Sequence, residues 1–264
     1  MKIILSRKGF DSTSGGYPSP IINNKVISLP IPDDKDDTRY SDLIFDRNIT
    51  YYDLMTDLGI KGLAKDSKCH LDPDLSILTT NDRPSGWRPL LGQIGGSQSH
   101  LEAQGVTIGD LFLFFGWFRR AEVVNGRFKY TGPDFHMIFG FLYIGEIVKV
   151  ANNHHIPDWL SYHPHIKRDD WKSNETNTLY IAPNINGGGV LEFNESLILT
   201  GNNRPKSQWY LPDFFKNVSI SHHPNPWKDS YFQSAGRGQE FVIGNSIDVE
   251  NWAKKIILNN KVNN

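Results

Sequence analysis

The chain has 264 residues with 38% apolar and 12% aromatic side chains, and its 28 basic and 29 acidic residues give a formal net charge of -1. This balance excludes a strong overall positive field, so an anionic partner must meet a local basic patch. The single cysteine, Cys69, excludes an internal disulfide and a zinc site built on several thiolates. Because there is no signal-peptide core and no apolar run of about 20 residues, we predict a cytoplasmic protein without a membrane span.

The first part of the chain predicts two short strands, a loop and a helix. Residues 2–5 (KIIL) and 25–31 (KVISLPI) are typical of strands that bracket a loop, and two prolines place the second strand at a sheet edge. In residues 50–63 apolar side chains recur at near-helical spacing. Thr50 is suited to the N-cap and Gly59 to the stop, which predicts a short helix.

The middle of the chain carries the strongest sheet signal. Residues 109–118 and 135–150 are dense in Phe, Leu, Ile and Val, and an Asn-Gly pair between them favours a hairpin turn. Residues 176–182 and 188–200 predict further strands, and residues 238–243 predict the last one. Together these stretches predict an antiparallel meander with a heavily buried face.

Residues 248–260 place apolar side chains on one face at a spacing of 3.6 residues, which predicts an amphipathic helix. Residues 259–264 are polar and are expected to fray. No fixed-period repeat and no Pro- or Ser-rich linker divides the chain, so we predict a single domain over residues 1–264. The expected fold class is α+β, with a strongly curved, mostly antiparallel sheet or barrel and short helices.

Two glycine-rich loops contain residues that can hold an anion. In residues 6–20 (SRKGFDSTSGGYPSP) the glycines allow backbone N–H groups to approach a ligand closely, and in residues 234–241 (SAGRGQEF) an arginine stands between two glycines. We predict that both loops converge on one cleft that binds a phosphate; the alternative is that each is a structural turn. The predicted phosphate-binding residues are Arg7, Lys8, Ser12, Ser14, Gly15, Gly16 and Arg237.

Residues 68–75 (KCHLDPDL) cluster one histidine with two carboxylates, which can form an acid–base pair or a metal site. The alternative is a turn, because Asp-Pro is a frequent turn initiator. We expect no metal site, because the sequence identifies no distant further ligand. The candidates for proton transfer are Asp11, His70 and Asp72.

Residues 87–119 combine glutamines, a histidine and aromatic side chains around a Gly-Gly pair. A glutamine amide both donates and accepts, which suits the edge of a base, and a tryptophan beside an arginine can stack on a base and meet a phosphate. The alternative, that the aromatic side chains form the core, is expected for most of them. The predicted base-binding residues are Gln93, Gln98, His100, Trp117 and Arg119.

Two further groups of histidines stand in loops that contain proline. They are His154, His155, His163 and His165 in the first loop, and His222 and His223 in the second. No HExxH motif and no cysteine partner accompanies them. We therefore expect surface or hydrogen-bonding histidines.

Four stretches resemble a known family. They read SRKGFDSTSGGYPSPI, HLDPDL, GQIGGSQSHL…GVTIGDLFLFFGWFR and SAGRGQEFV, and they are similar to the third of the nucleotide modification associated domains, over residues 2 to about 257. This resemblance implies a role beside DNA base hypermodification systems of phages and bacteria. A looser similarity links Gly-Asp and the strand FHMIFGFLYIGEIVKV to the central hairpin of PUA- and ASCH-like barrels, which bind RNA or modified bases.

The expected substrate or partner is thus a nucleotide or a base in DNA, with other proteins of a base-modification system as further partners and no membrane. Group transfer to the base is the reaction to test first, and the cofactor is unknown. Two alternatives stay open. One is a non-catalytic reader of modified bases or nucleotides, and the other is a scaffold without a nucleotide role.

Overall fold

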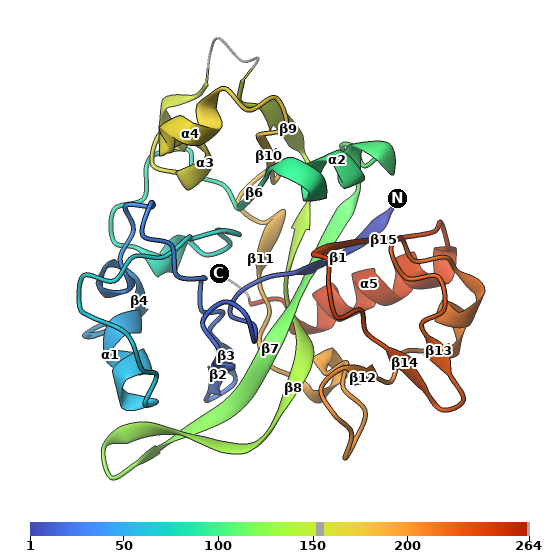
Figure 1. Cartoon of the computed structure of the whole chain (residues 1–264), viewed down its shortest axis with the longest axis horizontal. Helices are drawn as coiled ribbons and strands as arrows, with labels where there is room; N and C mark the ends of the chain where they lie inside the picture. Colours follow the sequence, from blue (N-terminus) through green and yellow to red (C-terminus); the bar gives the residue numbers. More distant parts are fainter. Residues whose placement is uncertain (152–155, 263–264) are drawn as a thin grey trace.

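The computed structural model describes residues 1–151 and 156–262, and it is a mixed α+β structure with mostly antiparallel sheets and few helices (Figure 1). The expected surface histidines His154 and His155 lie outside the described residues. None of the helices in the described part of the chain is long and apolar enough to cross a membrane.

A long antiparallel hairpin of β7 (Leu111–Val124) and β8 (Arg127–Tyr143) runs through the middle of the molecule (Figure 1). Its turn is formed by Asn125 and Gly126, whose φ angles of 53° and 74° lie in the left-handed region that these residue types adopt most readily. The hairpin that the sequence predicts is therefore confirmed.

Strands on both sides of the hairpin extend it to a seven-stranded sheet in the order β11-β8-β7-β1-β15, with β2 on β7 and β3 on β2. The strands β1 and β2 run parallel to β7, and the other pairs are antiparallel. The added strands are β1 (Ile3–Arg7), β2 (Ser19–Ile22), β3 (Lys25–Val26), β11 (Gly188–Val190) and β15 (Glu240–Ile243). The described strands follow an open path, so the expected barrel is not confirmed.

A separate three-stranded antiparallel sheet has the order β6-β10-β9 and positions the candidate site. Its strands are β6 (Leu90–Gln93), β9 (Glu146–Lys149) and β10 (Thr178–Ile181). The remaining strands are β4 (Ile44–Asp46), β5 (Ile49–Thr50), β12 (Gln208–Trp209), β13 (Trp227–Lys228) and β14 (Tyr231–Gln233).

The helices are short apart from the last one. They are α1 (Tyr51–Asp57), α2 (Gly95–Ala103), α3 (Pro164–Lys167), α4 (Asp169–Lys172) and α5 (Ile247–Asn260), with 3-10 turns η1 (Tyr40–Asp42), η2 (Ile77–Thr79), η3 (Asp158–Leu160), η4 (Glu195–Leu197) and η5 (Asp213–Asn217). Thr50 is the N-cap of α1, as the sequence predicts, and it forms a reciprocal capping pair with Asp53. The predicted C-terminal helix is confirmed as α5, and beyond it Lys261 pairs with Leu191.

Among the residues that the structure describes, three apolar clusters form the core. The largest surrounds the hairpin and contacts β1, β15 and α5, a second lies under α1, and a third lies under β6, β9 and β10. Four stretches differ from the sequence-based expectation. The stretch 25–31 forms only β3, and the stretch 135–150 is divided between β8 and β9, which belongs to the separate sheet. The stretch 188–200 forms only the short strand β11 and a 3-10 turn, and the glycine-rich stretch around residue 95 forms α2. Propensity disfavours glycine in a helix, so α2 could not be expected from local sequence.

Candidate functional site

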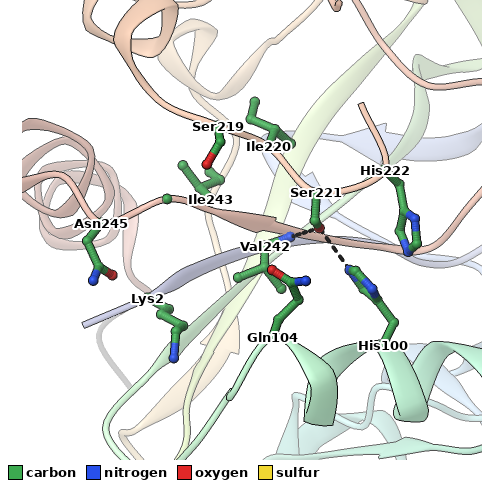
Figure 2. A pocket seen from close by; sticks show the side chains of 11 residues that line it. Lys2, His100, Gln104, Ser219, Ile220, Ser221, His222, Val242, Ile243 and Asn245 are labelled. Atoms are coloured by element: carbon green, nitrogen blue, oxygen red, sulfur yellow. Dashed lines mark hydrogen bonds between the residues drawn. The ribbon is translucent and has the colours of Figure 1, made fainter. Parts of the chain in front are cut away.

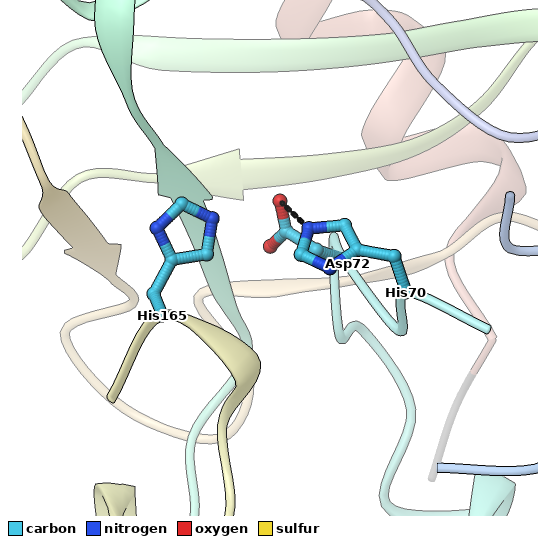
Figure 3. Close-up of side chains that lie close together, drawn as sticks. All are labelled: His70, Asp72 and His165. Carbon is cyan, nitrogen blue, oxygen red and sulfur yellow. Dashed lines mark ion pairs between the residues drawn. The ribbon is translucent and has the colours of Figure 1, made fainter. Parts of the chain in front are cut away.

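Four polar side chains from two distant segments converge in one buried place. His70 and Asp72 come from residues 68–75, and His163 and His165 come from the start of α3. The exposed fraction is 8% for His70, 0% for His163 and 2% for His165, and the Asp72 side chain is 4% exposed. In Figure 3 the rings of His70 and His165 flank the Asp72 carboxylate, and His165 directs a ring nitrogen toward it. We call His70, Asp72, His163 and His165 the histidine–aspartate centre.

The Asp72 carboxylate lies in the middle of this centre. Its Oδ1 accepts a hydrogen bond from the N–H of Gly92 at 2.7 Å and lies 3.5 Å from Nε2 of His163. Its Oδ2 lies 3.9 Å from Nε2 of His70. Burial raises the pKa of Asp72, but the Nε2 of His163, 3.5 Å from Oδ1, and the positive charge that the neighbouring imidazoles carry when protonated outweigh burial and hold the pKa below its ordinary value. The carboxylate is therefore ionised at neutral pH.

Two imidazoles of the centre are fixed by partners on their outer side. Nδ1 of His70 lies 2.6 Å from a carboxylate oxygen of Asp36, and Nδ1 of His165 lies 2.6 Å from the amide oxygen of Asn177. The Trp171 ring packs against both, at 5.6 Å and 4.6 Å between ring centroids. Both rings are therefore held with Nε2 on the inner side, where Asp72 lies. Burial lowers the pKa of His165 to about 3.

The backbone around the centre is adapted to these side chains. A Cβ atom at Gly92 would overlap the ring of His165, so only glycine lets that ring lie against β6. His163 is the N-cap of α3, with Pro164 at the first helical position, and its side chain accepts the N–H of His165 at 3.3 Å. The second carboxylate of the segment, Asp74, bonds Arg83 and Trp87.

The opening loop uses its polar groups internally. The Asp11 carboxylate accepts hydrogen bonds from the N–H and hydroxyl of Thr13 and from the N–H of Ser14, each at 2.7 Å. The N–H of Asp11 donates to the carbonyl of Ser14, and the N–H of Gly16 donates to the carbonyl of Asp11. Asp11 thus caps its own turn, and these hydrogen bonds also lower its pKa against the opposing effect of burial. Ser12 is exposed. Gly15, with φ of 88°, packs on Phe10 so closely that a Cβ would overlap the ring.

The two glycine-rich loops meet, but most of their cations already have partners. The Arg7 guanidinium donates to the carbonyl oxygens of Ala235 and Gly236 and is partly buried, which lowers its pKa. Lys8 forms an ion pair with Glu240 at 3.0 Å. Arg237 is exposed and forms no ion pair with the described residues. Of the three predicted cations, Arg237 is thus the most accessible to a phosphate.

Glu240 is a buried carboxylate that the sequence analysis did not single out. Its Oε1 accepts hydrogen bonds from Ser6, Lys8 and Gln93, and the exposed fraction of the residue is 2%. Its Oε2 has no partner within the described part of the chain. Gln93, predicted to contact a base, is thus engaged with Glu240.

A second polar place surrounds His100 on α2. Its Nε2 lies 2.8 Å from the hydroxyl of Ser221, which accepts the N–H of Val242 (Figure 2). The centroid of the His100 ring lies 3.7 Å from that of His222, and the two rings are tilted by 36°. These residues line a cavity of about 600 Å³. Burial and the nearby His222 lower the pKa of His100, so it can accept the serine proton. No carboxylate of the described residues bonds the other ring nitrogen, which makes this pair the weaker candidate for nucleophilic catalysis.

The other predicted base-binding residues lie in different places. Gln98 on α2 is buried and bonds Tyr180 and Glu102. Trp117 on β7 donates to Asp134 and has the Lys206 ammonium 3.2 Å from its ring centroid. Arg119 lies 5.7 Å from the ring centroid of Tyr130. The predicted set is therefore distributed over β6, α2 and the hairpin.

A larger cavity of about 840 Å³ lies beside the residues that flank Asp72. Leu71 and Pro73, the two chain neighbours of Asp72, both line it. Apolar and aromatic side chains form much of its wall, and amides, cations and the two carboxylates Asp46 and Glu192 contribute to the polar part. The aromatic members are Phe45, Tyr51, Trp87 and Phe139, the amides Asn23, Asn24 and Asn81, and the cations Lys25, Arg47 and Lys261.

Histidines from two separate motifs of the sequence come together in the structure. His163 and His165 were expected as surface or hydrogen-bonding histidines, and they are buried and hydrogen-bonded. The signal that could have joined them to residues 68–75 is the pair of similar motifs, His-x-Asp and His-x-His. Asp36 and Asn177, which bond Nδ1 of His70 and of His165, stand in no sequence motif that predicts this role.

The fold and the site define an α+β protein with a buried centre of histidines and a carboxylate. The chain belongs to the nucleotide modification associated domain 3 family, whose model matches residues 2–244. No curated protein and no solved structure matches the chain significantly. The family supports an involvement in nucleotide modification.

Proposed function

We propose that this protein is an enzyme that modifies a nucleotide or a nucleobase, and that the histidine–aspartate centre carries the reaction. The observation that supports this most is the convergence of three imidazoles on one buried carboxylate. Burying such a set costs stability unless it is fully paired, so it is more typical of a reactive site than of a structural one. The family supplies the nucleotide theme.

The centre can act on a substrate in two ways. Its imidazole lone pairs and carboxylate can move a proton, or they can hold a metal ion that activates a substrate oxygen. Either use fits a group transfer to a base, in which the attacking atom loses a proton. His70 and Asp72 are the residues we propose for this role. Asp11 is a weaker candidate, because its carboxylate already caps its own turn.

We place the substrate in the cavity of about 840 Å³. This volume lies in the range of small-molecule sites, and an aromatic wall suits the face of a base. Lys25, Arg47 and Lys261 at this cavity exceed its two carboxylates, Asp46 and Glu192, by one positive charge, which favours a phosphate. Leu71 and Pro73, which line this cavity, are the chain neighbours of Asp72, whereas the four side chains of the histidine–aspartate centre are not among the described lining residues.

The two glycine-rich loops are a second proposed place for a phosphate. The observation in its favour is that Arg7 contacts the loop 234–241 directly. In this arrangement Arg237 would bind the phosphate. Ser12 and Gly16, which are exposed and belong to the same loop as Arg7, would contribute further hydrogen bonds. Because Lys8 is committed to Glu240, we favour the cavity.

Mass spectrometry of nucleosides tests the function. DNA and free nucleotides would be prepared from cells that make the wild-type protein, Asp72→Asn, or the control Asp213→Asn, whose carboxylate is 90% exposed on η5. We expect an altered nucleoside with the wild type and the control, reduced at least about 100-fold with Asp72→Asn. Circular dichroism confirms that the variants fold.

Two outcomes would contradict the proposal. If the altered nucleoside persists with Asp72→Asn, the centre is not the reactive site. If the wild-type protein binds nucleotides at a saturable site but yields no altered nucleoside with any cell extract, the protein is a reader of nucleotides.

A further inference from the structure

On the inner side of the histidine–aspartate centre, two imidazoles and the carboxylate face one another. None of these three groups offers the others a proton for a hydrogen bond. Ligand atoms of His70, Asp72 and His165 all lie within 4.8 Å of one another. If each of these atoms carries a lone pair, they repel one another at this distance in a medium of low dielectric constant. The location of the ring protons therefore decides what the centre can bind.

The proton of His165 is on its outer nitrogen. Nδ1 faces the amide oxygen of Asn177, which can only accept a hydrogen bond. The orientation of this amide is fixed, because its nitrogen donates to the carbonyl oxygens of His165 and Trp171 at 2.8 Å and 3.1 Å. Nε2 of His165 thus presents a lone pair to the inner side.

The same holds for His70. Nδ1 of His70 lies 2.6 Å from the buried carboxylate of Asp36, which can only accept when it is ionised. Nε2 of His70 therefore presents its lone pair toward Oδ2 of Asp72, 3.9 Å away. This pairing of an outer acceptor with an inner lone pair is the arrangement that orients histidine ligands of metal ions.

His163 has a different part in the centre. Its Nδ1 accepts the N–H of His165, so its proton is on Nε2, which faces Oδ1 of Asp72 at 3.5 Å. Nε2 is fully buried and has no hydrogen-bond partner by strict geometry among the described residues. With the N–H of Gly92 it holds Oδ1 on the outer side and leaves Oδ2 directed at the two imidazoles. His163 is a positioning residue rather than a ligand.

We propose that His70, Asp72 and His165 bind one divalent transition-metal ion through Nε2, Oδ2 and Nε2. The cation would take the position on which the three lone pairs converge. Metal bonds of about 2.1 Å place neighbouring ligand atoms about 3–3.4 Å apart. Ligand atoms that lie up to 4.8 Å apart therefore need to approach one another by at most about 1.4–1.8 Å. The role of the metal ion in a reaction rests on the proposed function. Its binding does not, since metal binding can be measured without any substrate.

The donor set narrows the class of metal. Two imidazoles and one carboxylate suit Fe²⁺, Mn²⁺, Co²⁺ or Zn²⁺, whereas Mg²⁺ and Ca²⁺ prefer oxygen ligands. Three protein ligands leave positions open for water or substrate, as in catalytic rather than structural sites. Cys69 does not contribute a thiolate, because it is buried in the cluster under α1.

A neighbouring acidic group is a poorer site. Asp33, Asp36 and His70 also lie close together, but the Arg168 guanidinium is 2.8 Å from Asp33 and 3.7 Å from Asp36. This cation already offsets their charge. Asp72 has no arginine or lysine within 4 Å in the described structure, so a metal ion is favoured on its side.

Titration of the whole chain with metal ions tests the proposal. The purified protein is stripped with a chelator and titrated with Mn²⁺, Co²⁺, Zn²⁺ and, without oxygen, Fe²⁺, by calorimetry and by metal analysis after gel filtration. We expect one ion per chain and visible absorption bands for Co²⁺. Asp72→Asn and His165→Gln should weaken binding at least about 100-fold, and Asp36→Asn about 10–100-fold.

The control is His222→Gln, a histidine on an exposed loop outside the centre, which should bind metal like the wild type. Absence of stoichiometric binding of all four metals by the wild type would overturn the proposal, and so would unchanged affinity in both Asp72→Asn and His165→Gln. The wild-type result does not depend on how the variants fold. A chain that binds metal but alters no nucleoside would contradict the proposed function and leave the metal site intact.

Discussion

At the scale of single residues, Gly92 joins the parts of the candidate site. Its N–H holds the Asp72 carboxylate, and the missing side chain gives the ring of His165 its place against β6. One residue thus fixes groups from two distant segments. Its role depends on the absence of a side chain, because no other residue type leaves room for the ring.

Replacing Gly92 with alanine is expected to lower the free energy of unfolding by about 1–3 kcal/mol, because the methyl group displaces His165. The control is Gly96→Ala in α2, where an added methyl group meets no atom within 4 Å. That change should be neutral or stabilise by up to about 1 kcal/mol. Denaturant unfolding measures both variants, and equal stability of the two would contradict this packing.

At the scale of elements, His136 of β8 links the hairpin to the small sheet of β12, β13 and β14. Its Nδ1 accepts the indole N–H of Trp209 on β12 at 3.1 Å. Burial, and after it the charges of Arg7 and Lys206, lower the pKa of His136 to about 3. The folded protein therefore keeps this imidazole neutral where the unfolded chain, with a pKa near 6.5, takes up a proton.

Stability should consequently fall as the pH falls from about 6.5 toward 3, because the unfolded state binds one more proton there. Above pH 6.5 His136 is neutral in both the folded and the unfolded state, so it no longer makes the free energy of unfolding depend on pH. His136→Gln should reduce the slope of unfolding free energy against pH by up to about 1.4 kcal/mol per pH unit. Identical slopes for the variant and the wild type between pH 4 and 6 would refute the buried neutral state.

At the scale of the whole molecule, the first strand joins the last. The strand β1 lies between β7 and β15, and the ion pair of Lys8 with Glu240 is almost fully buried, at 8% and 1% side-chain exposure. This contact connects the opening loop to the loop before β15, which are far apart in the sequence. The meeting of the two loops is therefore a consequence of strand order.

Lys8→Met is expected to cost about 3–5 kcal/mol of unfolding free energy, because it leaves the Glu240 carboxylate buried without its cation. The double variant Lys8→Met with Glu240→Gln should be more stable than Lys8→Met alone. A double-mutant cycle from denaturant unfolding gives the coupling energy. If the effects of the two changes on the free energy of unfolding are additive, the interaction between Lys8 and Glu240 does not stabilise the fold.

Sequence alone predicted the elements that local signals define. Thr50 and Asp53 mark the start of α1, and Asn125-Gly126 marks the hairpin turn. The parallel pairing of β1 with β7 and the formation of helix α2 depend on tertiary contacts, so no local sequence pattern predicts them. For the site, His70 and Asp72 were predicted, but their union with His165 depends on the position of α3 against β6, which spacing in the sequence does not encode.

The most direct measurement is an anomalous difference map from crystals of the protein grown with Mn²⁺ or Zn²⁺ and recorded at the absorption edge of the metal. We predict one peak flanked by Nε2 of His70, Oδ2 of Asp72 and Nε2 of His165. A peak at Asp33 and Asp36 instead, or none in the presence of saturating metal, would contradict the assignment of the centre.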